Sequence, residues 1–254
     1  MIKNGGSLIN FHILTKVLYI WPKVNYIELS LANIARLSVL IPIALYFVRY
    51  NINSKIKGLS FFVLYLTYCF LNEAINYYLY KVLNNETYLF INLFTILEYL
   101  FIILFYRMIL QKKIYKKVLE VVSIIFIGYY LWDLIYFEDF TIDFASRPAA
   151  IESIILLTFS ILYLFEQIND TFTIFIYSKK SFWIVVAIII YLSGTFFLFI
   201  FAQKNMNDDV FAEQYTVMNS ILYIIKNLII SIAFLIPLPD NRDYGNPNYI
   251  NSYN

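Results

Sequence analysis

The chain has 254 residues and a formal net charge of +2, with 61% hydrophobic residues and only 14% charged residues. Soluble domains of this length are usually about 45–50% apolar and about 25% charged, so the composition excludes an ordinary soluble globular protein. The small net charge gives no basis for binding nucleic acid.

Seven apolar stretches are long enough to cross a bilayer, whose hydrocarbon core is about 30 Å thick and needs about 20 residues of helix. We predict an all-α fold, a single polytopic seven-helix transmembrane bundle that occupies residues 28–238. The predicted membrane helices cover residues 28–48, 59–81, 88–110, 116–137, 149–168, 182–202 and 214–236.

The two ends of the chain differ from the bundle. In residues 1–27, Phe11, Leu14, Leu18 and Trp21 recur at helical spacing, which predicts a short helix lying in the membrane interface. Residues 239–254 are rich in Asn, Tyr and Pro and predict a short disordered tail.

The loops between the predicted spans alternate in charge, which predicts the orientation of the bundle. By the positive-inside rule, the basic first, third and fifth loops lie in the cytoplasm. The N-terminus is then outside and the C-terminus cytoplasmic, in the inner (cytoplasmic) membrane of the cell. The basic loop residues are Arg49, Lys55 and Lys57; Arg107, Lys112, Lys113, Lys116 and Lys117; and Lys179 and Lys180.

Lys226 lies near the middle of the last span, QYTVMNSILYIIKNLIISIAFLIPL. A central Lys opposes membrane insertion by about 2.5–3.5 kcal/mol. We therefore expect Lys226 to point inward, at an acid, a ligand or a water-filled cavity, and Glu98 is its expected ion-pair partner. The other ionisable residues within the spans are Arg36, Glu73 and Asp133 in the outer halves of the first, second and fourth spans, Glu98 near the centre of the third, and Glu152 near the outer end of the fifth.

Three spans also carry polar stripes at helical spacing, and we expect these stripes to face one another in the bundle interior. They form either interhelical hydrogen bonds that hold the bundle together or part of a ligand site. The stripes are Tyr65, Tyr68, Asn72 and Asn76; Asn92, Thr95 and Tyr99 beside Glu98; and Tyr215, Asn219, Tyr223 and Lys226 beside Asn227.

Other site chemistries find no support. His12 is the single His and Cys69 the single Cys, so neither a His-based metal site nor an intrachain disulfide is expected. A Lys in a seventh helix invites comparison with microbial rhodopsins, but Leu222 stands where they have an Asp. No nucleotide-binding, zinc or hydrolase motif occurs, and no cofactor is expected. The GTFF segment of the sixth span is too weak a pattern to predict close helix packing.

The run YCFLNEAINYYLYKVLNNETYLFINLFTILEYLFIILFYRMIL, with NSILYIIKNLIISIAFL downstream, resembles a loosely defined group of bacterial seven-helix membrane modules. Some of these stand alone, and others precede histidine kinases as sensors. The resemblance implies a sensor that signals through a cytoplasmic or membrane protein partner in trans, because no output domain follows the bundle in this sequence.

The leading hypothesis is a receptor-like module that binds a small ligand in an outward-facing cavity between the second, third and seventh spans. The ligand would replace a Glu98–Lys226 ion pair and so shift the helices. The alternatives are a proton-coupled carrier that uses Glu98, a lipid-acting enzyme in which Asp133, Glu152 and Glu73 gather, and an accessory subunit of a membrane complex.

Overall fold

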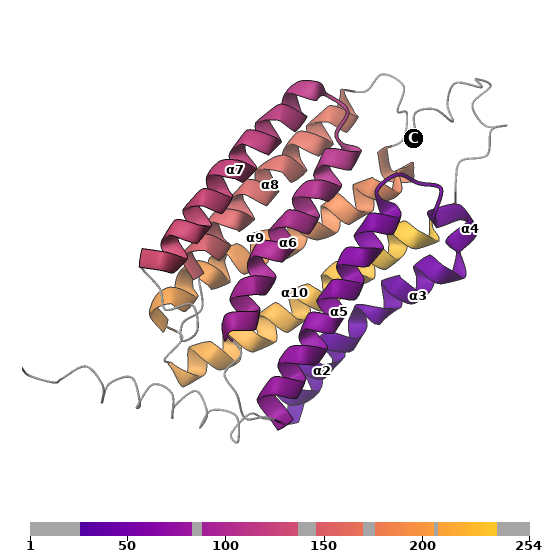
Figure 1. The fold of residues 1–254 in the computed structure, drawn as a ribbon. Coiled ribbons are helices and arrows are strands. Elements are labelled where there is room, and N and C mark those ends of the chain that lie inside the picture. Colours follow the sequence, from indigo (N-terminus) through magenta and orange to yellow (C-terminus); the bar gives the residue numbers. More distant parts are fainter. Residues whose placement is uncertain (1–25, 83–87, 137–145, 170–175, 206–207, 238–254) are drawn as a thin grey trace, which may run out of the picture.

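The computed structural model describes residues 26–82, 88–136, 146–169, 176–205 and 208–237, and these are helical with no strand among them (Figure 1). Each predicted span coincides with one long helical segment, so the predicted seven-helix bundle is confirmed. The proposed interfacial helix in residues 1–25 and the tail 239–254 lie outside the described residues. The elements are α2 (Tyr26–Ser38), α3 (Leu40–Val48), α4 (Tyr50–Asn53), α5 (Leu59–Val82), α6 (Tyr88–Ile109), α7 (Lys113–Tyr136), α8 (Ser146–Ile168), η2 (Ile176–Ser178), α9 (Lys180–Asn205) and α10 (Asp209–Leu235).

The first span is divided into α2 and α3 at Val39, whose backbone still has right-handed helical angles. Pro42 explains the division because it has no N–H to donate to the carbonyl of Ser38 and its ring crowds that carbonyl. The first span is therefore one continuous helical segment that lacks a backbone hydrogen bond near its middle.

The helices form three groups, with α7 and α8 on one side of the bundle, α2, α3 and α5 on the opposite side, and α6, α9 and α10 between them (Figure 1). Helix α10 packs against α9, α2 and α3, while α6 packs against α5, α7 and α8. Helix α6 thus contacts both sides, and α9 and α10 together connect α8 to α2 and α3.

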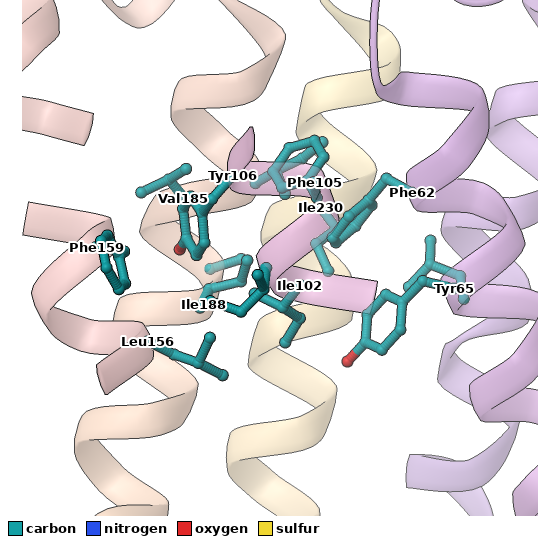
Figure 2. Close-up of a cluster of buried hydrophobic side chains, with 14 of the residues drawn as sticks. Phe62, Tyr65, Ile102, Phe105, Tyr106, Leu156, Phe159, Val185, Ile188 and Ile230 are labelled. Carbon is teal, nitrogen blue, oxygen red and sulfur yellow. The ribbon is translucent and has the colours of Figure 1, made fainter. Parts of the chain in front are cut away.

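A layer of buried apolar side chains fills the bundle between α5, α6, α8, α9 and α10 (Figure 2). Burial of such side chains stabilises by about 1.5–3 kcal/mol each in water, and in lipid the same contacts contribute packing. We refer to the following labelled residues as the apolar layer: Phe62, Tyr65, Ile102, Phe105, Tyr106, Leu156, Phe159, Val185, Ile188 and Ile230.

The outward faces of the helices are apolar as well. On α7, Ile124, Ile125 and Ile135 are 72%, 66% and 74% exposed. Seven long helices with apolar exposed faces match a hydrocarbon surround, and the chain is a multi-pass membrane protein.

The basic loops gather at one end of the bundle, where hydrogen bonds tie the helices together. Lys180 Nζ donates to Asn53 Oδ1 at 2.7 Å, joining α9 to α4. An Arg49 guanidinium N–H donates to the carbonyl of Leu235 at 2.5 Å, joining the end of α3 to the end of α10. This common placement is what the charge alternation of the loops requires, whichever side of the membrane the end faces.

Glu166 holds the turn between α6 and α7 at this same end. Its carboxylate accepts the backbone N–H of Gln111 at 2.9 Å and that of Lys112 at 2.6 Å, and the side chain is buried. Glu166 therefore satisfies two backbone donors of the turn that leads into α7.

We expect Glu166→Ala to lower the unfolding free energy by about 1.5–3 kcal/mol, because two partly buried backbone donors lose their carboxyl acceptor. Denaturation of the purified chain in detergent measures the change. Glu120→Ala is the control, since Glu120 forms a largely exposed pair with Arg107 and its loss should change stability by less than about 1 kcal/mol. Equal effects of the two changes would contradict the role given to Glu166.

Candidate functional site

Polar side chains lie one helical turn beyond the apolar layer, towards the end where α6 and α10 begin. Helices α5 and α9 run antiparallel to α6 and α10. Residues near the end of α5 or α9 therefore lie at the same depth in the bundle as residues near the beginning of α6 or α10. Each polar residue is three or four positions from a member of the apolar layer and shares its helix face: Cys69 follows Tyr65 on α5, Glu98 precedes Ile102 on α6, Tyr191 follows Ile188 on α9, and Lys226 precedes Ile230 on α10.

We call Cys69, Glu98, Tyr191, Tyr223 and Lys226 the polar layer. Their proximity is supported by electrostatic interactions that cross the bundle. Lys226 interacts with Cys69, and Glu98 interacts with Cys69 and with both tyrosines. The layer therefore joins four helices, α5, α6, α9 and α10.

The Lys226 side chain is 2% exposed and contacts two aromatic rings that meet edge to face. Its Nζ is 4.2 Å from the centre of the Tyr191 ring and 4.1 Å from that of Tyr223. Each cation–π contact contributes about 0.5–2 kcal/mol. The Nζ atom has no hydrogen-bond partner among the described residues, so the ring faces attract the ammonium while its N–H donors stay unsatisfied.

Glu98 is held by Tyr65, whose hydroxyl donates to Oε1 at 2.6 Å. The expected Glu98–Lys226 ion pair is wrong: the ion pairs between described residues are Arg36–Glu73 and Arg107–Glu120. The reason is packing, because the tyrosines of α9 and α10 surround the Lys226 ammonium and the hydroxyl of α5 satisfies Glu98.

Arg36 and Glu73 form an ion pair between the first two spans. Their side chains pair across α2 and α5 with 3.4 Å between Arg36 Nε and Glu73 Oε2, and they are 27% and 39% exposed. Arg36 also lies over the Tyr77 ring at 5.4 Å and donates to Asn33 Oδ1 at 3.0 Å. Glu73 interacts electrostatically with Lys226, but its near partner is Arg36.

The predicted asparagines do not gather around Lys226 as a single polar cluster. Asn227 is fully buried and its Nδ2 donates to Ser38 Oγ on α2 at 2.7 Å, so it faces away from the polar layer. Asn76 is partly buried and its Oδ1 has no partner among the described residues. Asn72 and Asn219 are partly buried, and neither is hydrogen-bonded to Lys226 in the part of the chain that the structure describes.

The stripe of the third span faces α7 rather than the Lys226 side. The carbonyl of Asn92 accepts from the Tyr130 hydroxyl at 2.6 Å, and the Tyr99 hydroxyl donates to Ser123 Oγ at 3.1 Å. The expectation that this stripe faces the stripes of α5 and α10 is therefore wrong. Neighbouring positions on a helix differ in direction by about 100°, which separates Tyr99 from Glu98.

Asp133 belongs to the α7 side as well. It is 2% exposed, the Tyr129 hydroxyl lies 3.4 Å from its Oδ1, and its Oδ2 has no partner among the described residues. Glu73 is on α5, and α6 lies between α5 and the α7–α8 pair (Figure 1). The gathering of Asp133, Glu152 and Glu73 that a lipid-acting enzyme would need is therefore not supported.

Sequence reasoning missed Tyr191, the α9 member of the polar layer, and gave Cys69 only a packing role. The available signal was Gly194, in the GTFF segment that was judged too weak to predict close packing. A Cβ at Gly194 would lie 2.5 Å from Leu222 Cδ1 on α10, so α9 and α10 approach closely there. This contact, one turn from Tyr191 and adjacent to Tyr223, brings both rings to Lys226.

We expect Gly194→Ala to be less stable than Gly128→Ala by about 1–3 kcal/mol, because both gain helix propensity but only the methyl at position 194 forces Leu222 to move. Thermal denaturation in detergent measures the shift. Gly128→Ala on α7 is the matched control, since a Cβ there meets nothing within 4 Å and alanine favours a helix by about 0.5–1 kcal/mol. Equal stability of the two variants would show that the close approach is unimportant.

Comparison with known proteins does not assign a family, because no family model, curated protein or solved structure matches the chain. Among the described residues, no group of three His, Cys, Asp or Glu side chains is placed to hold a metal ion. A functional proposal therefore depends on the geometry of the polar layer.

Proposed function

We propose that the chain is a receptor-like module of the cytoplasmic membrane that binds a small ligand in the polar layer and signals through a protein partner. The observation that carries the proposal is the buried Lys226 side chain, whose Nζ contacts two tyrosine rings and finds no hydrogen-bond acceptor in the described part of the chain. Buried charges in membrane helices are usually paired or in contact with water, and those that are neither mark functional sites.

Most of the side chains around Lys226 in the polar layer are more exposed than Lys226 itself. Glu98, Tyr191 and Tyr223 are partly exposed, whereas Lys226 is buried beneath them. A ligand that enters among these side chains would reach Nζ and supply the missing acceptor. The apolar layer would close the path on the other side, so entry is from the end where α6 and α10 begin, the predicted outer side.

Helix α10 offers a route from the polar layer to the basic end. It carries Tyr223 and Lys226 in the layer, and its last carbonyl accepts from Arg49 at the opposite end. A ligand that draws Lys226 away from the tyrosine rings would move α10 relative to α9 and thereby change the Arg49 contact. A partner protein bound at the basic loops would respond to the altered Arg49 contact.

The test is a thermal-shift screen of small metabolites on the purified full chain in neutral detergent. A ligand at about 100 times its Kd adds about 2.7 kcal/mol of stability to the protein that binds it. We expect stabilisation of the parent and of Lys117→Met, in which an exposed lysine of α7 is removed. We expect none for Lys226→Met. Stabilisation that survives Lys226→Met would place the site elsewhere and refute the proposal.

A second candidate is a proton-coupled carrier, favoured by Asp133, whose buried carboxylate oxygen has no partner among the described residues. Such a group could accept a proton during transport. Proton flux into liposomes that contain the chain, abolished by Asp133→Asn or Glu98→Gln, would support this function over the receptor. Absence of flux in a preparation that still binds ligand would exclude it.

A further inference from the structure

We propose that the ligand of the polar layer carries one negative charge, such as a carboxylate, on an aromatic or aliphatic body. This inference rests on the proposed function and names the chemical class of its ligand. The sequence alone showed an excess of acids in the spans and gave no reason to prefer an anion.

Among the described residues, each charged side chain on the Lys226 side of the bundle has an ion-pair or hydrogen-bond partner except one. The Arg36 guanidinium faces Glu73 at 3.4 Å, and Glu98 accepts the Tyr65 hydroxyl at 2.6 Å. Lys226 is left with two ring faces and no acceptor. The unsatisfied group is thus a cation, and an anionic oxygen is the acceptor that an ammonium binds most strongly.

The number of charges on the ligand follows from the same neighbours. Lys226 is the only cation among the residues that define the polar layer, and Glu98 lies in the layer with a negative charge when ionised. A second anionic group on the ligand would have no cation to meet and would be repelled by Glu98. A phosphate or a dicarboxylate is therefore disfavoured relative to a monocarboxylate.

The body of the ligand is inferred from the surfaces beside Lys226. The rings of Tyr191 and Tyr223 both contact its Nζ and meet edge to face, with their centres 6.1 Å apart, and the floor below the layer is formed by apolar side chains such as Ile230 and Ile188. Aromatic and aliphatic groups pack favourably on such surfaces. The structure thus offers one charged contact and otherwise apolar or aromatic contacts.

Two series of probes test the inference, and within each series only the polar head group changes, from anionic to neutral to cationic. Phenylacetate, phenylethanol and phenylethylamine share an aromatic body, and octanoate, octanol and octylamine share an aliphatic one. Binding to the full chain in lipid nanodiscs is measured by calorimetry, for the parent, Lys226→Met, Lys226→Arg and the control Lys117→Met. Nanodiscs without protein correct for partition of each probe into lipid.

We expect a carboxylate to bind at least tenfold more tightly than the alcohol and the amine of its series. Lys226→Met should lose this preference, while Lys226→Arg and Lys117→Met should retain it. Equal binding of the alcohol, preferred binding of the amine, or a preference that survives Lys226→Met would overturn the inference.

The outcome also separates this inference from the proposed function. If neither carboxylate binds but a neutral or cationic compound from the metabolite screen binds through Lys226, the anionic class is wrong and the receptor proposal stands. If no compound in either experiment binds in a Lys226-dependent way, both are refuted.

Discussion

We expect Lys226→Met to raise the unfolding free energy of the chain by about 1–3 kcal/mol while it abolishes ligand binding. A central Lys opposes insertion by about 2.5–3.5 kcal/mol, and the cation–π contacts with Tyr191 and Tyr223 offset only part of that. Methionine has a similar length and no charge, so it retains the packing and removes the unsatisfied donors. Gain of stability with loss of function is typical of binding sites that carry strain or unpaired charge.

Denaturation in detergent measures the stability, and the metabolite screen measures binding on the same preparation. Lys117→Met should change neither quantity appreciably, because Lys117 is exposed on α7. A loss of stability in Lys226→Met would show that the ammonium is paired within the folded chain. In that event Lys226 is a structural residue and the receptor proposal loses its main support.

The second large effect concerns the hydrogen bond between Tyr65 and Glu98, which joins α5 to α6 at 2.6 Å. We expect Tyr65→Phe to lower the unfolding free energy by about 1.5–3 kcal/mol, because the partly buried carboxyl group of Glu98 loses its donor. Glu98→Gln should weaken the same contact. In a double-mutant cycle the combined variant should be less destabilised than the sum of the single changes predicts.

Tyr68→Phe is the matched control for the Tyr65 change. Tyr68 is on the same helix and stacks on Phe94 and Phe101 with interplanar angles of 14° and 29°, contacts that phenylalanine keeps. We expect it to cost less than about 1 kcal/mol. Additive effects of Tyr65→Phe and Glu98→Gln would show that the two groups do not interact in the protein.

The positions of the helices could be predicted because they depend on local properties of the sequence. Each stretch of about 20 apolar residues must form its own backbone hydrogen bonds in lipid, so it becomes a helix whatever its neighbours are. Lys226 was singled out for the same reason, since the free energy of a charge at the centre of a span does not depend on which helix lies beside it. The common level of Arg36 and Glu73 likewise follows from their distance along each span.

The partners of each polar side chain could not be predicted in this way. Lys226 and Asn227 are adjacent in the chain, yet Lys226 faces Tyr191 on α9 and Asn227 faces Ser38 on α2. A change of one residue turns the side chain by about 100° around the helix, so a small rotation of α10 selects different neighbours. The sequence pattern specifies a polar face only to within such a rotation.

The sequence by itself thus determined that this protein crosses the membrane seven times, which loops share one end, and that one buried cation needs an explanation. The tertiary structure alone decided that Lys226 meets two tyrosine rings instead of Glu98, and that Asn92 and Asp133 belong to a separate side of the bundle. The physical reason is that hydropathy acts on each helix separately, whereas contacts depend on the rotation and order of helices that are far apart in the chain. The close approach of α9 and α10 at Gly194 fixes that rotation for Lys226.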